Sequence, residues 1–302
     1  MSTGFKQTPN TQPSLGQSDR VFRFSTADDC PEYEHLTELE SRSIFIIREA
    51  FEKCDSPGVL WSMGKDSTVL LWLIRKAFLG RVPFPVLHVN TGYKIPSMIA
   101  FRDHISKLWG MELIVSENRD KLPTEQTYPD GDATRVECCS SLKKDALKDL
   151  VTKHHLEALF VGIRRDEDGM RAKERYFSPR KKDFEWDYEG QPLEVWDQFN
   201  TDLNRGSHLR IHPLLHWTEI NIWEYIDREH IPTMSLYFAD EGRTRYRSLG
   251  CAPCTFPIRS TATTVPEIID ELKLSRVAER STRAQDQECD SAFEELRKSG
   301  YM

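Results

Sequence analysis

The stretch Trp61–Phe78, WSMGKDSTVLLWLIRKAF, decides the fold, because a turn with a single glycine joins an apolar run to an amphipathic one. The residues that lead into it, Gly58–Ser62 (GVLWS), are typical of a short buried strand. After the turn, apolar residues recur at helical spacing, namely Val69, Leu70, Leu73, Ile74 and Ala77. The stretch therefore predicts a strand, a tight turn and a helix in direct succession.

The same alternation continues along the chain. It predicts strands at Pro83–Asn90, Met111–Glu117 and Glu157–Ile163, helices at Pro96–Trp109 and Ser141–His154, then a strand near His208 and a helix capped by Thr218. Such a pattern is typical of an α/β doubly wound fold, with a mostly parallel sheet and helices on both faces. Because ligands bind at the carboxyl ends of such strands, we expect the site at the loops after Ser62, Asn90 and Gly162.

Composition predicts three regions. Residues 1–30 are rich in Ser, Thr, Gln and Pro and predict a flexible tail. Residues 31–235 carry the strand and helix alternation and predict the nucleotide-binding domain. Residues 236–302 predict a C-terminal extension with one helix around Pro266–Leu274 and a charged, mobile end.

Charge and hydrophobicity limit the classes of function. The chain of 302 residues has 41 Lys and Arg against 48 Asp and Glu, which argues against a generally basic nucleic-acid coat but not against a local basic groove. It contains neither a membrane-length apolar run nor a signal pattern, so we expect a cytoplasmic protein with no membrane partner. Seven unevenly spaced cysteines fit reduced thiols. A homo-oligomer is left open.

The turn itself is built for an anion. Backbone N–H groups and the following helix N-terminus converge there, with Gly64 permitting close approach. Ser62 and Ser67 supply hydroxyl donors, Lys65 supplies a positive charge, and Asp66 is available to fix the loop or to hold a divalent cation. The six residues alone leave a second interpretation open, an ordinary strand-to-helix turn capped by Asp66 or Ser67. The spacing differs from the Walker pattern.

The string S-x-G-x-D-S at 62–67 resembles the pyrophosphate loop of the PP-loop ATP pyrophosphatases, which cut ATP between the α and β phosphates. That resemblance implies an adenine nucleotide alpha-hydrolase-like (HUP) fold with ATP as the bound nucleotide. It also implies that the turn holds the β and γ phosphates.

Longer strings extend the resemblance. PFPVLHVNTGYK, GIRRDEDGMRAKERYFSPR, HPLLHWTEINIWEYI and VPEIIDELKLS look like consecutive segments of the small subunit of the heterodimeric bacterial sulfate adenylyltransferase (CysD), a relative of the phosphoadenosine phosphosulfate reductases. The resemblance implies an active site lined by charged residues of the second string, namely Arg164, Arg165, Asp166, Glu167, Arg171 and Lys173, next to Gly162.

These residue types suit phosphoryl chemistry. Arginines clamp phosphate or sulfate oxygens bidentately and stabilise the charge that develops at the α-phosphorus. Asp166 and Glu167 are candidate ligands for Mg²⁺, which prefers carboxylate and phosphate oxygens. A surface cluster of ion pairs is the alternative interpretation of the same run.

Two cysteine pairs depart from the small-subunit pattern. Cys138 and Cys139 are adjacent, and Cys251 and Cys254 form a C-x-x-C motif. Four soft ligands suit an iron-sulfur cluster or tetrahedral zinc, and buried free cysteines are the alternative. The combination resembles the 4Fe-4S motif of the assimilatory adenylylsulfate reductases, so we expect a 4Fe-4S cluster.

An ATP-cleaving loop together with a cluster motif also resembles the DndC/SspD-type DNA phosphorothioation proteins. The main prediction is therefore an ATP pyrophosphatase that adenylates an oxyanion for sulfur insertion into DNA, with a cysteine desulfurase and other sulfur-modification proteins as partners. The alternative is sulfate adenylyltransferase subunit 2, which makes adenylylsulfate and works with a GTPase large subunit.

Two further functions are weaker. An adenylylsulfate reductase needs a C-terminal Cys-Gly-Leu-His motif, and Cys289 lacks the Gly-Leu-His that follows in that family. A nucleotide-sensing scaffold without turnover has little physical need for Asp66 in an intact loop. Asn90 stands where the family usually has Asp, which leaves one metal or ribose contact without an explanation.

Overall fold

The computed structural model describes residues 34–118, 126–199, 208–283 and 295–300. The chain divides into a unit that ends at Glu34 and a unit from His35 to Met302, and the described strands all fall in the second. The predicted tail and Cys289 lie outside the described residues.

A six-stranded sheet forms the centre of the second unit. Its strands are β1 (Pro57–Leu60), β2 (Val86–Asn90), β3 (Leu113–Glu117), β4 (Ala158–Phe160), β5 (Phe177–Arg180) and β6 (His208–Ile211). Their order is β3-β2-β1-β4-β6-β5, and all neighbours are parallel except β5 and β6. The predicted α/β doubly wound fold is confirmed.

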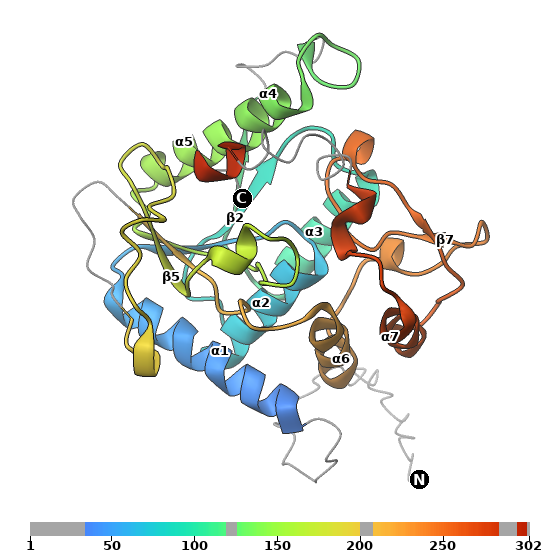
Figure 1. Cartoon of the computed structure of the whole chain (residues 1–302), viewed down its shortest axis with the longest axis horizontal. Helices are drawn as coiled ribbons and strands as arrows, with labels where there is room; N and C mark the ends of the chain where they lie inside the picture. Colours follow the sequence, from blue (N-terminus) through green and yellow to red (C-terminus); the bar gives the residue numbers. More distant parts are fainter. Residues whose placement is uncertain (1–33, 119–125, 200–207, 284–294, 301–302) are drawn as a thin grey trace, which may run out of the picture. The chain divides into compact units, whose positions relative to one another are not determined.

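Helices α1 (Glu34–Lys53), α2 (Lys65–Ala77) and α6 (Glu219–Glu229) lie together on one side of the strands (Figure 1). Charged side chains join all three helices, because Lys76 of α2 contacts Glu40 of α1 at 2.8 Å and Glu229 of α6 at 3.1 Å. Every residue of β1, β4 and β6 is buried, as expected for central strands covered on both faces.

Three further helices lie between β2 and β4 in the chain, namely α3 (Pro96–Leu108), α4 (Arg135–Cys139) and α5 (Ala146–Lys153). The segment predicted as one helix at Ser141–His154 is instead a π-helical turn, Ser140–Asp145, followed by α5. Thr134 and Glu137 form a capping box at the start of α4. The wide π-helical turn therefore follows directly on the paired cysteines at the end of α4.

After α6 the chain forms a two-stranded ribbon, β7 (Thr244–Arg245) and β8 (Ile258–Arg259), and helix α7 (Val265–Leu274), which packs against α6. The helix predicted around Pro266–Leu274 is confirmed, with a capping box from Thr264 and Glu267. A 3-10 turn, Glu279–Thr282, follows. None of the described helices combines the length and the apolar character of a membrane span.

Candidate active site

The turn between β1 and α2, residues 62–67, folds compactly and forms a cradle of hydrogen-bond donors. Gly64 is in the extended region and precedes the first residue of α2, while Met63 has a φ of 63°, in the left-handed region. The hydroxyl oxygens of Ser62 and Ser67 lie 3.1 Å apart, and the Ser62 oxygen accepts from the Gly64 N–H at 3.4 Å. The loop thus gathers hydroxyls and N–H groups at a helix N-terminus, as the sequence predicts.

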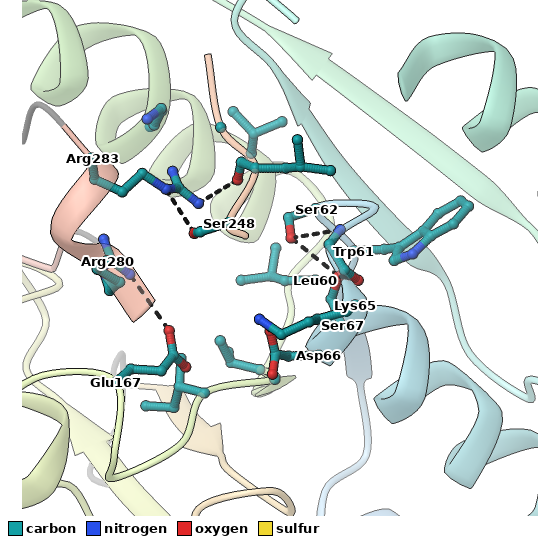
Figure 2. Close-up of a pocket in the computed structure, with 18 of the residues that line it drawn as sticks. Leu60, Trp61, Ser62, Lys65, Asp66, Ser67, Glu167, Ser248, Arg280 and Arg283 are labelled. Carbon is teal, nitrogen blue, oxygen red and sulfur yellow. Dashed lines mark hydrogen bonds and ion pairs between the residues drawn. The ribbon is translucent and has the colours of Figure 1, made fainter. Parts of the chain in front are cut away.

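A cavity of about 160 Å³ opens above this turn. Figure 2 shows the loop residues on one side and residues of the 3-10 turn after α7 on the facing side. The lining includes five predicted loop residues and three predicted residues of the loop after β4, namely Ser62, Gly64, Lys65, Asp66, Ser67, Gly162, Glu167 and Arg171. Thr91 and Lys94, which follow β2, also line the cavity, so the structure brings together all three loops that the sequence singled out.

Gly162 has a packing reason to be glycine. A Cβ atom there would lie 3.1 Å from the backbone carbon and oxygen of Asp66 and from the Cα of Ser67. The loop after β4 therefore presses directly on the backbone of the cradle, and a side chain at this position would displace it.

Lys65 is buried and committed to carboxylates. Its Nζ lies 3.3 Å from Asp66 and forms a close ion pair with Glu279, and its backbone N–H donates to the Tyr237 hydroxyl at 2.8 Å. Burial favours the neutral form of Glu279, but Lys65 and Arg164 outweigh it and hold the pKa of that carboxyl well below its usual range. Glu279 therefore lies as a carboxylate beside the cradle lysine.

Arg164 is fully buried and bound by carboxylates rather than presented to the cavity. It pairs closely with Asp66 and with Glu279, and its Nε donates to Asp166 at 2.9 Å. Burial opposes its charge, but Glu279, Glu167 and Asp166 raise its pKa above the ordinary value. Arg164 thus acts as the centre of an ion-pair network that fixes Asp66 and Glu279.

The other predicted residues of the charged block have varied positions. Glu167 lines the cavity with Arg171, and the two form an ion pair. Arg165 stacks its guanidinium 5.4 Å from the centre of the Tyr176 ring, and Lys173 is exposed with its Nζ 3.7 Å from the Met170 sulfur. Asp166 accepts from the Glu219 backbone N–H at 2.8 Å. Arg165, Asp166 and Lys173 are not among the residues that line the cavity.

Three residues that the sequence analysis missed form the facing wall. Glu279, Arg280 and Arg283 all line the cavity. Arg280 lies 3.5 Å from Glu167, and Arg283 donates to Ser248 at 2.8 Å (Figure 2). They come from a segment interpreted as a charged, mobile end. The sequence signal that could have found them is a second cluster of arginines, Arg280 and Arg283, which directly follows Glu279.

The carboxylates offer no preformed magnesium site. The predicted ligands Asp166 and Glu167 are paired with arginines, as are Asp66 and Glu279. Within residues 34–118, 126–199, 208–283 and 295–300, no group of three or more His, Cys, Asp and Glu side chains is arranged to hold a metal ion.

The four predicted cysteines converge on a second cavity of about 10 Å³. Cys138, Cys139, Cys251 and Cys254 all contribute to its lining, together with Lys143. Two contacts position the thiols: Thr91 Oγ1 lies 3.2 Å from the Cys251 sulfur, and Lys143 Nζ lies 3.7 Å from the Cys139 sulfur. The cysteines of two distant motifs therefore meet in space, although they do not form a preformed metal site.

The thiols differ in acidity. Burial alone would raise the pKa of Cys251, but Lys143 and Lys94 outweigh it and lower that pKa to about 7. Burial raises the pKa of Cys254 to about 11, and the neighbouring Cys251 adds to the shift. The cations around the cavity thus favour at least one thiolate, which fits a thiolate-ligated group.

Asn90 has a local explanation. Its side-chain N–H donates to Glu117, the last residue of the adjacent strand, and its side-chain oxygen accepts from the Gly92 N–H at 3.0 Å. An aspartate could make only the second contact and would place two carboxylates side by side. An amide at position 90 therefore suits the carboxylate of Glu117 on β3, because it can donate a hydrogen bond to it.

The comparison with protein families gives one matching model, the phosphoadenosine phosphosulfate reductase domain, over residues 56–257. Among curated proteins, sulfate adenylyltransferase subunit 2 of Rhizobium tropici is 40% identical over 298 residues, covering 89% of this chain and 93% of that protein. The protein of the same name from Halorhodospira halophila is 40% identical over 297 residues, covering 89% and 97%.

Solved structures agree on the fold. The phosphoadenylyl-sulfate reductase of Candida auris, in a phosphate complex, gives a TM-score of 0.50 at 15% identity, covering 74% of this chain and 97% of that one. The FMN adenylyltransferase of Candida glabrata in complex with ATP gives 0.53 at 18% identity, covering 91% and 87%. At these identities the likeness concerns the fold alone.

The relatives correct the main functional prediction. DNA phosphorothioation was wrong as the leading function, because relatives at 39–40% identity over 89% of the chain are named sulfate adenylyltransferase subunit 2. The findings likewise lend no support to a cysteine desulfurase or DNA as partners. The alternative prediction is the one that the relatives favour.

Proposed function

The chain belongs to the phosphoadenosine phosphosulfate reductase domain family and, within it, groups with the sulfate adenylyltransferase subunit 2 proteins, and on this basis we propose that it activates sulfate. As an ATP-binding, adenylyl-transferring enzyme, it would join AMP to sulfate and release pyrophosphate. The observation that carries the proposal is the 40% identity to a subunit 2 protein over 298 residues, which include the whole cradle and the arginine-rich loop.

The reaction requires one bond to form and one to break. A sulfate oxygen attacks the α-phosphorus of ATP, the bond from that phosphorus to the α–β bridging oxygen breaks, and its electron pair leaves with pyrophosphate. Charge therefore moves onto the leaving pyrophosphate. The cradle N–H groups, the Ser62 and Ser67 hydroxyls and Lys65 support this step, because they are donors positioned around one anion site.

Arginines from two loops support the same assignment. Arg171 from the loop after β4 lines the cavity, and Figure 2 shows Arg280 and Arg283 from the segment after α7 across the cavity from the cradle. Guanidinium groups bind phosphate oxygens in a planar, bidentate geometry and stay charged at all working pH values. Their role would be to hold the substrate anions in line rather than to transfer protons.

Nucleotide binding must rearrange one contact. Glu279 pairs with Lys65, the cradle cation, so the phosphates compete with this carboxylate for the same ammonium group. Mg²⁺, which the reaction class implies, would neutralise phosphate charge, and because the cavity carboxylates are paired, it would be held chiefly by phosphate oxygens.

The relatives' name implies a second subunit, and we propose that this chain also works with a large subunit of sulfate adenylyltransferase that is a GTPase. The proposal is tested by co-purification, with size-exclusion chromatography of the two chains mixed at equal concentration. Co-elution supports it, and separate elution at micromolar concentration contradicts it.

We further propose that Cys138, Cys139, Cys251 and Cys254 bind a 4Fe-4S cluster. The support is their convergence on one cavity lined by Lys143, whose charge offsets that of a thiolate-ligated centre. Iron and acid-labile sulfide are measured on anaerobically purified protein and on a variant with all four cysteines changed to Ser. About four irons per chain, lost in the variant, support the cluster; zinc or no metal contradicts it.

The sulfate-activating function is tested by product analysis. The chain, alone and with a large subunit, is incubated with ATP, ³⁵S-sulfate and inorganic pyrophosphatase, which removes the product that opposes the reaction. Labelled adenylylsulfate is the expected product, and Lys65→Met should abolish it. If AMP and pyrophosphate form without any sulfonucleotide, the chain cleaves ATP for another acceptor and the proposal is wrong.

A further inference from the structure

A small cavity of about 30 Å³ shares part of its wall with the nucleotide cavity. Val161, Ile163 and Arg171 line both. On this measure one water needs about 10 to 15 Å³, so the small cavity has space for more than one water. Residues that follow β4 thus form a wall common to the two spaces.

Arginines dominate the charged lining of this cavity, and two of them, Arg171 and Arg297, are paired with Asp168 outside it. Four arginines line it against a single carboxylate: Arg171, Arg180, Arg210 and Arg297 against Glu174. Arg180 and Arg210 are 2% and 3% exposed. In the antiparallel β5–β6 pair, Arg210 is the register partner of Ser178, and Arg180 follows two residues later, so both arginines are on one face of the sheet.

The two buried arginines differ in how their charges are paired. Arg180 pairs with Glu174 at 2.7 Å, and Arg210 donates to the Gly300 carbonyl at 2.6 Å. Within the described part of the chain, no carboxylate lies within salt-bridge distance of Arg210, and the Nε of each arginine lacks a hydrogen-bond partner. The pair thus carries one guanidinium charge that the described carboxylates do not directly neutralise.

Arg210 keeps that charge at neutral pH. Burial lowers its pKa, and Arg180 lowers it further, to about 9. His212, which also lines the cavity, is neutral under the same conditions, because burial lowers its pKa to about 4. Burying an uncompensated guanidinium destabilises the fold unless an anion accompanies it.

We propose that this cavity is the subsite for the oxyanion acceptor, a small tetrahedral dianion that under the proposed function is sulfate, bound by Arg180 and Arg210. The identity of the ion rests on the proposed function. The existence of the site is inferred separately, from the arginines that line the cavity. A tetrahedral dianion offers oxygens to both guanidinium groups and supplies the missing negative charge.

The shared wall gives the site its place in the reaction. An anion held by Arg210 is separated from the nucleotide by Ile163 and Arg171, and Arg171 lines both cavities. An oxygen of the acceptor therefore needs to pass only this boundary to reach the α-phosphorus. The site would raise the local concentration of sulfate beside ATP and leave nucleotide affinity to the cradle.

The test separates sulfate from nucleotide. Arg210→Met removes the charge and keeps an apolar stem, while Arg259→Met, at an exposed arginine of β8, is the matched control. Sulfate binding is measured by calorimetry at constant ionic strength in the presence of α,β-methylene-ATP, with phosphate and chloride as competing anions, and the KM values for sulfate and ATP are measured by turnover. The expected result is at least tenfold weaker sulfate binding and a KM for sulfate raised to match in Arg210→Met only, with analogue affinity unchanged.

Unchanged sulfate binding in folded Arg210→Met overturns the subsite. So does a parallel loss of sulfate and nucleotide affinity. If Arg210→Met does not fold, Arg180→Lys and Arg210→Lys decide by the same criterion, because each keeps the charge and loses the planar fork. If the wild-type chain binds sulfate at Arg210 without making adenylylsulfate, the proposed function fails and the subsite stands. If chloride binds with the same affinity as sulfate, the site is an unspecific anion site and the proposed subsite is wrong.

Discussion

Glu279 is bound to Lys65 across 214 positions of sequence, and this ion pair places a carboxylate beside the lysine of the phosphate cradle. The same carboxylate also binds Arg164. Under the proposal that nucleotide phosphates bind this lysine, the relationship predicts competition between Glu279 and the nucleotide.

Glu279→Gln should therefore have opposite effects on stability and binding. Removing one charge from a buried network should cost about 3 kcal/mol of the free energy of unfolding. Pyrophosphate should bind about tenfold more tightly, because it no longer displaces a carboxylate. Urea unfolding and calorimetry with pyrophosphate measure the two effects.

Glu271→Gln, which removes the partner of buried Arg245 outside the cavity, is the control and should leave pyrophosphate affinity unchanged. Weaker pyrophosphate binding in Glu279→Gln would contradict the competition.

The contact between Gly162 and the cradle can be tested with a matched glycine. Gly162→Ala should destabilise the protein by about 1 to 3 kcal/mol and weaken ATP binding, because its Cβ would meet the Asp66 backbone at 3.1 Å. Gly169→Ala, in the same loop, meets nothing within 4 Å and should be neutral. Thermal melts and titration with an ATP analogue check both. Equal behaviour of the two variants would show that the loop contact does not position the cradle.

Stability should fall on mild acidification. Burial lowers the pKa of His88 and of His212 to about 4, from 6.5. Between pH 6.5 and 4 the unfolded chain therefore binds more protons than the folded one, so stability rises with pH in this window and is lost as pH falls through it. The loss is up to about 3 kcal/mol for each histidine.

Urea midpoints measured from pH 7.5 to 4.5 test this dependence. His212→Gln should flatten the slope without removing it, because His88 still titrates. A midpoint that stays constant from pH 6.5 to 4.5 would contradict the buried, neutral state of both rings.

Asn90→Asp should cost about 1 kcal/mol, because it replaces the donor to Glu117 with a second carboxylate. Adding Glu117→Gln should recover most of the loss, since the amide and carboxylate are then exchanged between the strands. A double-mutant cycle in urea checks this. Additive losses in the double variant would mean that the two side chains do not interact.

The fold could be predicted because its signal is local. The run from Gly58 to Ala77 has a buried strand, a turn and an amphipathic helix within twenty residues, and the structure has each of them. Strand β5 was not foreseen, because FSPR combines a proline and an arginine that do not suit a central strand. As an edge strand it tolerates Pro179, whose missing N–H need not join a ladder.

The part of the cavity wall that could be predicted lies in the cradle and in the loop after β4, which contributes Gly162, Glu167 and Arg171. Loop residues from Ser62 to Ser67 form a contiguous motif, whereas Glu279 and Arg280 reach the cavity through a tertiary contact that no periodicity announces. The charged run around Arg164 suggested that this arginine binds phosphate. In the structure Arg164 is buried and pairs with the carboxylates of Asp66, Asp166 and Glu279. Which cation in a run faces a ligand depends on the backbone path.

The function was misjudged for a related reason. Four cysteines that meet in one cavity are a local feature that several enzyme classes share, whereas the similarity to sulfate adenylyltransferase subunit 2 covers 89% of the chain. Identity of 40% over 298 residues constrains the acceptor more strongly than one added motif.

The measurement that tests the central claim most directly is the exchange of labelled pyrophosphate into ATP, with and without sulfate, by the chain together with a large subunit. If the chain activates sulfate, the exchange depends on sulfate, disappears in Lys65→Met, and requires higher sulfate in Arg210→Met. Exchange that proceeds at full rate without sulfate, or that no sulfate concentration elicits, would contradict the claim that this protein activates sulfate.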